Sequence, residues 1–314
     1  MKNPDKIEIA ILDQGCFKWW ENNDSDLAKS YAKYYGMFEM ECYDFSDNNN
    51  QFNGQPAGSH GFWVMDRLLQ VCGNPDKVKI INCKVFGKQQ TRTQSLLNAL
   101  DFVSEQEVDL VNLSLGIPRS GRISDSTLNN FNSTLNKIMK KGLTIISAGN
   151  EGEVLSNGQP IDNTNLLTDD KDNNLSVGSH NRSGEWDRFS SVGGTVDVSA
   201  LGSDLNLLGE RKISKVSGTS FSAPSFCGVC GNYLIDQFSK IRNDEKTVKE
   251  VIYEHLDEAI KPVYRRSWKK AFKKEKYNPW FGKGSFESYV NYFIKHYGRD
   301  VLQYELFLEQ LRTM

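Results

Sequence analysis

The sequence of 314 residues lacks a long hydrophobic run and a strong net charge. No stretch reaches the roughly 18 uncharged apolar residues of a membrane span, and the mean hydropathy is −0.54. Because 38 Lys and Arg balance 40 Asp and Glu, the composition excludes a nucleic-acid coat and an acidic disordered tail. Glu8 interrupts a very short apolar run near the N-terminus, so no secretory signal is expected. These absences predict a soluble protein without a membrane contact, which we expect in the cytoplasm.

Cysteine is also sparse. Six cysteines are scattered between Cys16 and Cys230 without the dense pattern of small disulfide-linked domains, so we expect reduced thiols. The one close pair is Cys227-x-x-Cys230, and zinc would need a second pair or nearby histidines, of which the chain has four. We interpret this pair as two small buried side chains at i, i+3 of a core helix, and we predict no metal site.

The apolar pattern alternates between short runs rich in β-branched residues and longer stretches with helical spacing. Such an alternation is typical of an α/β domain with a mostly parallel sheet and helices on both faces. We find no linker long enough to divide the chain and no internal repeat, so residues 1–314 are predicted to form a single domain. The predicted strands are 7–12, 78–83, 108–113, 143–147 and 175–178, and the predicted helices are 61–71, 93–106, 128–140 and 225–238.

Four polar side chains stand where predicted strands end or helices begin. Asp13 follows the first strand, Asn150 follows the strand 143–147, and His60 and Ser220 lie just before apolar helices. A buried acid can orient a histidine, an Asn between glycines can donate to an oxyanion, and a helix N-terminus favours developing negative charge. Each residue alone has a simpler explanation, as a turn, a structural histidine or a helix cap. In parallel sheets, however, chemistry gathers at the carboxyl ends of the strands, which these positions share.

In chain order, these segments resemble the motifs of the subtilisin-like serine peptidases, the subtilase family. The most specific match is residues 218–224 (GTSFSAP), which resemble the family's Gly-Thr-Ser-x-Ala-x-Pro motif. Residues 13–15 (DQG) and 60–63 (HGFW) resemble its Asp-Thr-Gly strand end and its His-Gly-Thr-His helix start, and residues 148–150 match its Ala-Gly-Asn segment. The similarity extends from about residue 6 to about residue 292 and includes segments 84–86, 111–116, 188–193 and 196–202.

The resemblance implies a three-layer α/β fold and hydrolysis of peptide bonds in a peptide or protein substrate. Carried over position by position, it implies Ser220 as the nucleophile, His60 as the general base and then acid, and Asp13 as the orienting carboxylate. Asn150 would donate to the oxyanion. The substrate would lie extended and add a strand to the sheet edge, at the positions Leu113, Ser114, Leu115, Gly116, Ser147, Ala148 and Gly149.

Three positions depart from the family pattern. Gln14 replaces the usual Thr of the first motif, and Phe62 and Trp63 replace the Thr and second His after His60. None of these changes removes a reacting group, and we expect a bulkier, more aromatic wall near His60. Two alternatives to an active peptidase stay open. One is a catalytically silent peptide-binding or assembly subunit, and the other is a peptidase that is active only within a larger complex.

Regulation and ion binding follow from the same resemblance. The first predicted strand begins at about residue 6, which leaves no room for a signal or a pro-segment, so the chain resembles the intracellular type of subtilase. Such an enzyme needs restraint, and we expect limited processing of a specific peptide or protein. Calcium is common in the family, and residues 44–50 or 169–173 carry oxygen ligands. We interpret both segments as solvated loops and predict no cofactor.

A basic aromatic segment lies near the C-terminus. Residues 261–276 carry eight basic residues and one acid, and Tyr264, Trp268 and Phe272 fall on one helical stripe. The simpler interpretation is a helical insertion that packs its aromatics on the domain and leaves its basic face in water. The alternative is a docking face for an acidic partner or substrate, or for nucleic acid. The near-neutral charge of the whole chain argues against nucleic acid. Residues 285–314 are predicted to form a C-terminal helical segment.

Overall fold

The computed structural model describes most of the chain up to residue 259. The described residues are 5–16, 36–46, 54–87, 92–106, 108–117, 123–152, 165–169, 172–182, 186–191, 196–209, 213–243 and 245–259, with the single positions 29, 32 and 52. The predicted helical insertion at 261–276 and the predicted helical segment at 285–314 lie outside these residues and stay predictions, as does the division of the chain into domains.

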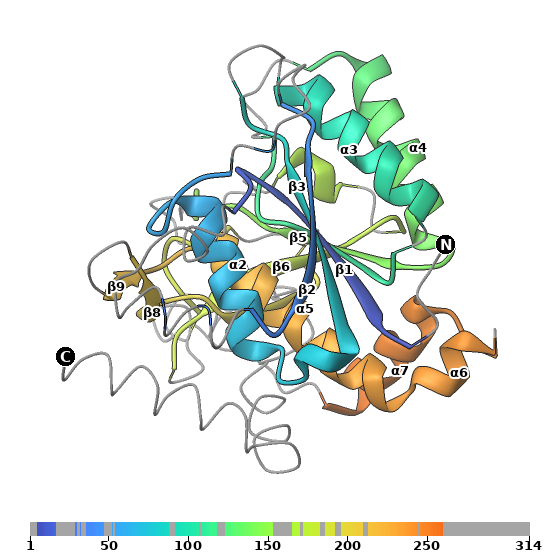
Figure 1. Cartoon of the computed structure of the whole chain (residues 1–314). Helices are drawn as coiled ribbons and strands as arrows, with labels where there is room; N and C mark the ends of the chain where they lie inside the picture. The colour runs from blue at the N-terminus through green and yellow to red at the C-terminus, as the bar shows by residue number, and fades with distance from the viewer. Residues whose placement is uncertain are drawn as a thin grey trace, which may run out of the picture.

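A seven-stranded parallel sheet forms the centre of the molecule (Figure 1). Its spatial order is β2-β3-β1-β4-β5-β6-β7. β1 therefore lies between β3 and β4, where the chain order of the strands reverses, and ligands of open α/β sheets bind at the carboxyl ends of the strands beside such a point. The strands are β1 (Ile7–Asp13), β2 (Glu39–Asp44), β3 (Val78–Lys84), β4 (Leu110–Leu113), β5 (Leu143–Ser147), β6 (Leu175–His180) and β7 (Val198–Leu201).

Helices cover both faces of the sheet, as Figure 1 shows. α2 (His60–Val71) and α5 (Thr219–Asp236) pack on one face, and α3 (Arg92–Gln106) and α4 (Asp125–Met139) pack on the other. β1 contributes side chains to the core on each face of the sheet, because successive strand residues point to opposite faces. Ile9 and Ile11 belong to the core under α2 and α5, whereas Ala10 and Leu12 belong to the core under α3 and α4. The predicted three-layer α/β fold is confirmed.

All five predicted strands are present, but the prediction missed the two edges of the sheet. β2 reads Glu-Met-Glu-Cys-Tyr-Asp and is exposed or half-buried along its whole length. Such an edge strand lacks the continuous apolar run by which buried parallel strands are recognised. β7 has only four residues, and the short antiparallel pair β8 (Leu205–Leu208) and β9 (Ile213–Val216) was also not predicted.

The predicted helices are confirmed with shifted starts. α4 begins at Asp125 and not at 128, because Ser124 caps it by accepting a hydrogen bond from the Thr127 N–H. α5 begins at Thr219, six residues before the predicted start, and Cys227 and Cys230 are buried in it. Burial raises the pKa of both thiols well above the ordinary value. The interpretation of this pair as core side chains is confirmed.

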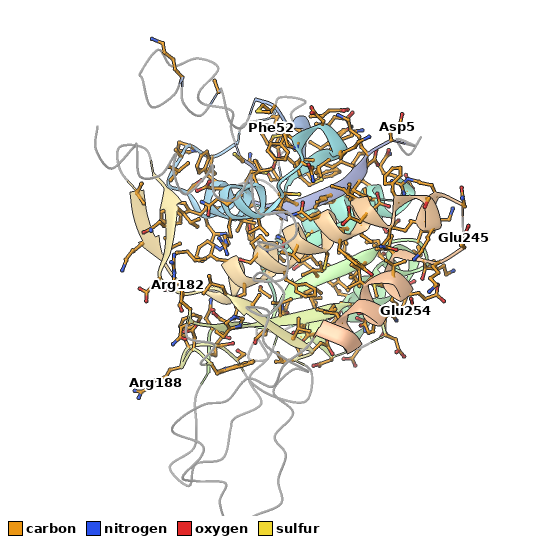
Figure 2. All side chains as sticks on the ribbon, turned by 90° about the horizontal axis from the view of Figure 1, so that it is seen from below. Asp5, Phe52, Arg182, Arg188, Glu245 and Glu254 are labelled. Atoms are coloured by element: carbon orange, nitrogen blue, oxygen red, sulfur yellow. The ribbon has the colours of Figure 1, made fainter. Side chains whose placement is uncertain are left out.

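Two further helices, α6 (Phe238–Arg242) and α7 (Val248–Ala259), follow α5 and lie near the start of β1 (Figure 1). Among the residues that the structure describes, no helix is both long and apolar enough to cross a membrane. Charged side chains project from the outside of the molecule, as the labelled examples Arg182, Arg188, Glu245 and Glu254 show in Figure 2.

Candidate active site

Asp13 and His60 meet at the carboxyl end of the central strand. Asp13 is the last residue of β1 and its side chain is 1% exposed, whereas His60 is the first residue of α2 and its side chain is 36% exposed. His60 Nδ1 lies 2.9 Å from Asp13 Oδ1, which also accepts from the Gln14 N–H at 2.7 Å. The Ser59 side chain caps α2 and so fixes where the helix presents its first residue.

The environment of His60 sets its protonation. Burial lowers the pKa of His60, but the hydrogen bond that Asp13 accepts from His60 and the negative charge of that carboxylate together outweigh burial and leave the pKa raised above 6.5. Because Nδ1 is committed to Asp13, the other ring nitrogen, Nε2, is the one left to exchange a proton with a substrate or nucleophile. The arrangement is that of a histidine oriented and polarised by a buried acid.

Ser220 lies at the start of α5, next in the chain to a residue whose ring is near His60. It is the second residue of the helix, and the next residue, Phe221, places its ring centroid 5.8 Å from that of His60. Ser220 Oγ donates to the carbonyl oxygen of Ser114 at 3.2 Å, which is its one hydrogen bond within the described part of the chain. The N-cap of α5 is Gly218, which has no side chain with which to cap the helix, and in the first turn the Thr219 N–H donates to the Asn150 side chain and the Phe221 N–H to the Gly218 carbonyl oxygen.

Asn150 is held in one orientation by Thr219. The Asn150 side-chain oxygen accepts from the Thr219 N–H at 2.8 Å and from the Thr219 hydroxyl at 3.0 Å. The same hydroxyl oxygen accepts from the N–H of Gly149, whose φ of +110° favours glycine. With the amide oxygen occupied on the Thr219 side, the amide nitrogen of Asn150 points away from Thr219 and is available as a donor.

A pocket opens next to Ser220 and Asn150. Of the predicted substrate-binding residues, Leu115, Gly116, Ser147 and Gly149 line it. Ser114 contacts Ser220 through its carbonyl oxygen, whereas Leu113 and Ala148 have no exposed surface. Four further residues that the sequence analysis did not single out also line the pocket, namely Ile117, Glu151, Asn165 and Thr219. Asn165 lies in a polar loop with no local signal, and only its contacts reveal it.

The aromatic wall near His60 differs in part from the expectation. Phe62 points into the hydrophobic core and is 2% exposed, so it does not contribute to a wall at the site. The ring of Phe221 lies near His60, and Trp63 meets Phe221 edge-to-face with the two centroids 6.4 Å apart. Trp63 Nε1 donates to the Leu208 carbonyl oxygen at 2.9 Å and so fastens α2 to β8.

A metal site does not emerge from the described residues, among which no group of three or more His, Cys, Asp or Glu could hold an ion. The segment 44–50 is a poor fit for calcium where it is described. Asp44 Oδ2 pairs with Lys84 Nζ at 2.8 Å, and Asp44 Oδ1 accepts from Ser46. The carboxylate is therefore already neutralised by a buried lysine.

The fold is that of the subtilisin-like serine peptidases. Residues 5–260 match the sequence pattern of the Subtilase family, so the chain belongs to that family and is a serine-type endopeptidase. Two curated relatives agree. The major intracellular serine protease of Bacillus subtilis (strain 168) is 23% identical over 259 residues, which cover 78% of this chain and 75% of that protein. Thermitase of Thermoactinomyces vulgaris is 26% identical over 231 residues, which cover 71% and 73%.

Solved structures support the fold. A lanthipeptide protease superimposes with a TM-score of 0.66 at 17% identity, covering 92% of this chain and 87% of that one. A cold-adapted subtilisin-like serine proteinase superimposes with a TM-score of 0.57 at 19% identity, covering 84% and 86%.

Proposed function

We propose that Ser220, His60 and Asp13 act as the catalytic triad and that Asn150 is the oxyanion donor. Ser220 Oγ attacks the substrate carbonyl carbon while its proton passes to His60 Nε2. The resulting oxyanion accepts from the Asn150 amide and the Ser220 N–H. The C–N bond then breaks as His60 returns the proton to the leaving amine, and water hydrolyses the acyl-enzyme by the same route. This chemistry uses only side chains and water, so we propose no cofactor.

The observation that carries the proposal is the contact of 2.9 Å between the buried Asp13 carboxylate and His60 Nδ1. A lone structural histidine has no need of a buried charged partner, because burying a carboxylate costs free energy unless it is paired. The locked amide of Asn150 supports the same assignment, since a donor fixed in advance is what stabilises a developing oxyanion.

The first test is labelling of the purified protein with a fluorophosphonate. We expect wild type to be labelled and the variants Ser220→Ala and His60→Ala to lose labelling, because the first lacks the nucleophile and the second lacks its base. Circular dichroism of each variant serves as the folding control. Gln14→Ala, which keeps Asp13 and His60, should retain labelling.

Two other outcomes would favour the alternatives. If folded wild type is not labelled alone or in cell lysate, the chain is a silent peptide-binding or assembly subunit. If it is labelled only in lysate, the triad needs a partner within a larger complex. The hydrogen bond from Ser220 to the Ser114 carbonyl oxygen supports the need for a partner, because that bond must break before the hydroxyl can donate to His60.

We further propose that the enzyme acts in the cytoplasm by limited processing of a specific peptide or protein. The support is that a curated relative is named an intracellular serine protease and that a structural neighbour is a lanthipeptide protease. Incubation with unfolded casein should then give few fragments. Extensive digestion would contradict limited processing while leaving the triad assignment intact.

The basic segment at 261–276 is proposed as a docking face for an acidic region of the substrate or of a partner. Its support is compositional, because eight of its sixteen residues are basic in a chain whose remaining residues carry a net negative charge. Docking outside the cleavage site would give a protease selectivity that the pocket next to Ser220 alone does not supply.

A further inference from the structure

Two helices carry the proposed catalytic side chains, and they pack against each other along their length. His60 begins α2, Ser220 is the second residue of α5, and the ring of Phe221 lies near that of His60. Further along α5, a Cβ at Gly228 would lie 2.9 Å from the Leu68 carbonyl oxygen. The lack of a side chain at Gly228 therefore lets the two helix backbones approach closely. How the helices are held along this contact decides where each of them presents its first turn.

The first turn of α5 is not held by the helix alone. Pro224 lies within α5, and because proline has no N–H, the carbonyl oxygen of Ser220 receives no helical hydrogen bond from it. The next residue, Ser225, has no exposed surface, and its Oγ donates to the Phe221 carbonyl oxygen at 2.7 Å. The same Oγ lies 3.0 Å from the Leu201 carbonyl oxygen at the end of β7. Ser225 thus connects the turn that carries Ser220 to the sheet.

Arg67 extends this connection to α2. It follows His60 by seven residues, which is close to two helical turns, so both side chains project from the same face of α2. Arg67 Nε donates to Ser225 Oγ at 2.6 Å, and Arg67 Nη1 donates to Gln70 Oε1 at 3.3 Å. Gln70 Nε2 in turn donates to the Asn206 carbonyl oxygen of β8 at 3.3 Å. A chain of hydrogen bonds thereby joins α2 to α5 and to β8.

We propose that Arg67 is a positioning residue, which sets the distance between His60 and Ser220. It acts through its hydrogen bond to Ser225, and the inference rests on the proposed function of His60 and Ser220. A guanidinium suits this role because its donors lie in a rigid plane, and a hydrogen bond from a charged donor is stronger than one between neutral groups. The Ser220 proton passes to His60 only across hydrogen-bond distance, so a shift of about 1 Å between the helices would slow the reaction roughly 100-fold.

A second connection between the same helices provides the matched control. Asn232, near the end of α5, donates from Nδ2 to the Val71 carbonyl oxygen at 2.7 Å and accepts from the Gly73 N–H at 3.0 Å. These hydrogen bonds also join α2 to α5, but at the opposite end of the helices from His60 and Ser220. Their loss should lower stability and leave the first turns of both helices in place.

The test measures kcat and KM for one peptide, together with the urea midpoint of each variant. Arg67→Met and Ser225→Ala each remove one partner of the bond, and each should lower kcat roughly tenfold or more at an unchanged KM. The double variant should be no slower than Ser225→Ala alone, because both changes break the same bond. Arg67→Lys keeps a charged donor and should recover part of the lost kcat. Asn232→Ala should retain the wild-type kcat despite a lower midpoint.

The rate of fluorophosphonate labelling should fall together with kcat, because both reactions need the Ser220 proton to pass to His60. If Arg67→Met does not fold, Ser225→Ala decides the question, since it removes the acceptor and keeps the arginine. An active wild type whose kcat is unchanged in Ser225→Ala would overturn this inference alone. So would a loss of kcat in Asn232→Ala as large as that in Ser225→Ala. Wild type that neither takes the fluorophosphonate nor cleaves any peptide would overturn the proposed function and this inference with it.

Discussion

At the scale of single residues, the proposed role of Asp13 predicts how activity depends on pH. A protonated His60 cannot accept the Ser220 proton, so activity should fall as the pH drops through the pKa of His60. Because the hydrogen bond and charge of Asp13 outweigh burial and raise that pKa, we expect the acid limb of kcat/KM to lie above pH 6.5. In Asp13→Asn only burial remains, so the limb should move below 6.5 while the maximal rate falls roughly 10⁴-fold.

The measurement is kcat/KM for one peptide between pH 5 and 9. Gln14→Ala is the control, since it leaves the Asp13 carboxylate in place and should not move the limb. An identical acid limb in wild type and Asp13→Asn would show that a group other than His60 titrates there.

At the scale of whole elements, a buried ion pair joins a helix to two strands. α6 is tied to the beginnings of β1 and β4 by Arg242, which makes two contacts of 2.8 and 2.9 Å with the Asp109 carboxylate and donates to the Lys6 carbonyl oxygen at 2.7 Å. Asp109 has no exposed surface and also accepts from the Glu8 N–H. This ion pair lies at the amino ends of the strands, opposite to the candidate active site, and we assign it to stability.

Removal of one partner from this buried pair should be costly. We expect Arg242→Met to lower the free energy of unfolding by about 3–5 kcal/mol, because it leaves a buried carboxylate without its cation. Urea unfolding followed by circular dichroism measures the change as a lower midpoint at an unchanged slope.

The matched control is Lys246→Met, which removes an exposed pair with Glu254 on α7 and should change stability by less than about 1 kcal/mol. Equal midpoints for the Arg242 and Lys246 variants would contradict the assignment of the Arg242 and Asp109 pair as a fastening of α6. A second contact between elements joins α2 to β8. The Asp66 carboxylate accepts from the Leu208 N–H at 2.8 Å, which connects the helix that carries His60 to the hairpin before Ser220.

At the scale of the whole molecule, charge is divided unevenly along the chain. Residues 241–314 hold 15 basic and 11 acidic residues, whereas residues 1–240 hold 23 and 29. If the segment 261–276 is a docking face, reversing the charge of Lys269, Lys270, Lys273 and Lys274 should lower kcat/KM for the natural substrate at least tenfold and spare a short peptide. The two substrates are compared in the same assay at low and high salt, because surface electrostatics are screened by ions. Equal effects on both substrates would remove the docking proposal.

The central strands of the sheet were predictable from the sequence, whereas its edge strands were not. Buried strands such as Ile7–Asp13 are mostly apolar apart from Glu8 and the final Asp13, and such runs are read directly from a sequence, whereas the edge strand Glu39–Asp44 carries charges and half-buried side chains and gives no such run. The direction in which Phe62 points was not predictable, because it follows from how α2 packs on the core and not from its distance to His60 along the chain.

The sequence by itself determined the family and the candidate site residues with their order along the chain, because Asp13, His60, Asn150 and Ser220 stand in short motifs whose local geometry is encoded by neighbouring glycines and helix starts. Only the tertiary structure decided what surrounds them. The orientation of Asn150 depends on Thr219, which lies 69 positions away, and Asn165 bridges two strand ends that meet only in the folded sheet. Hydrogen bonds between distant segments leave no periodic pattern in the sequence, so these contacts could not have been predicted from it.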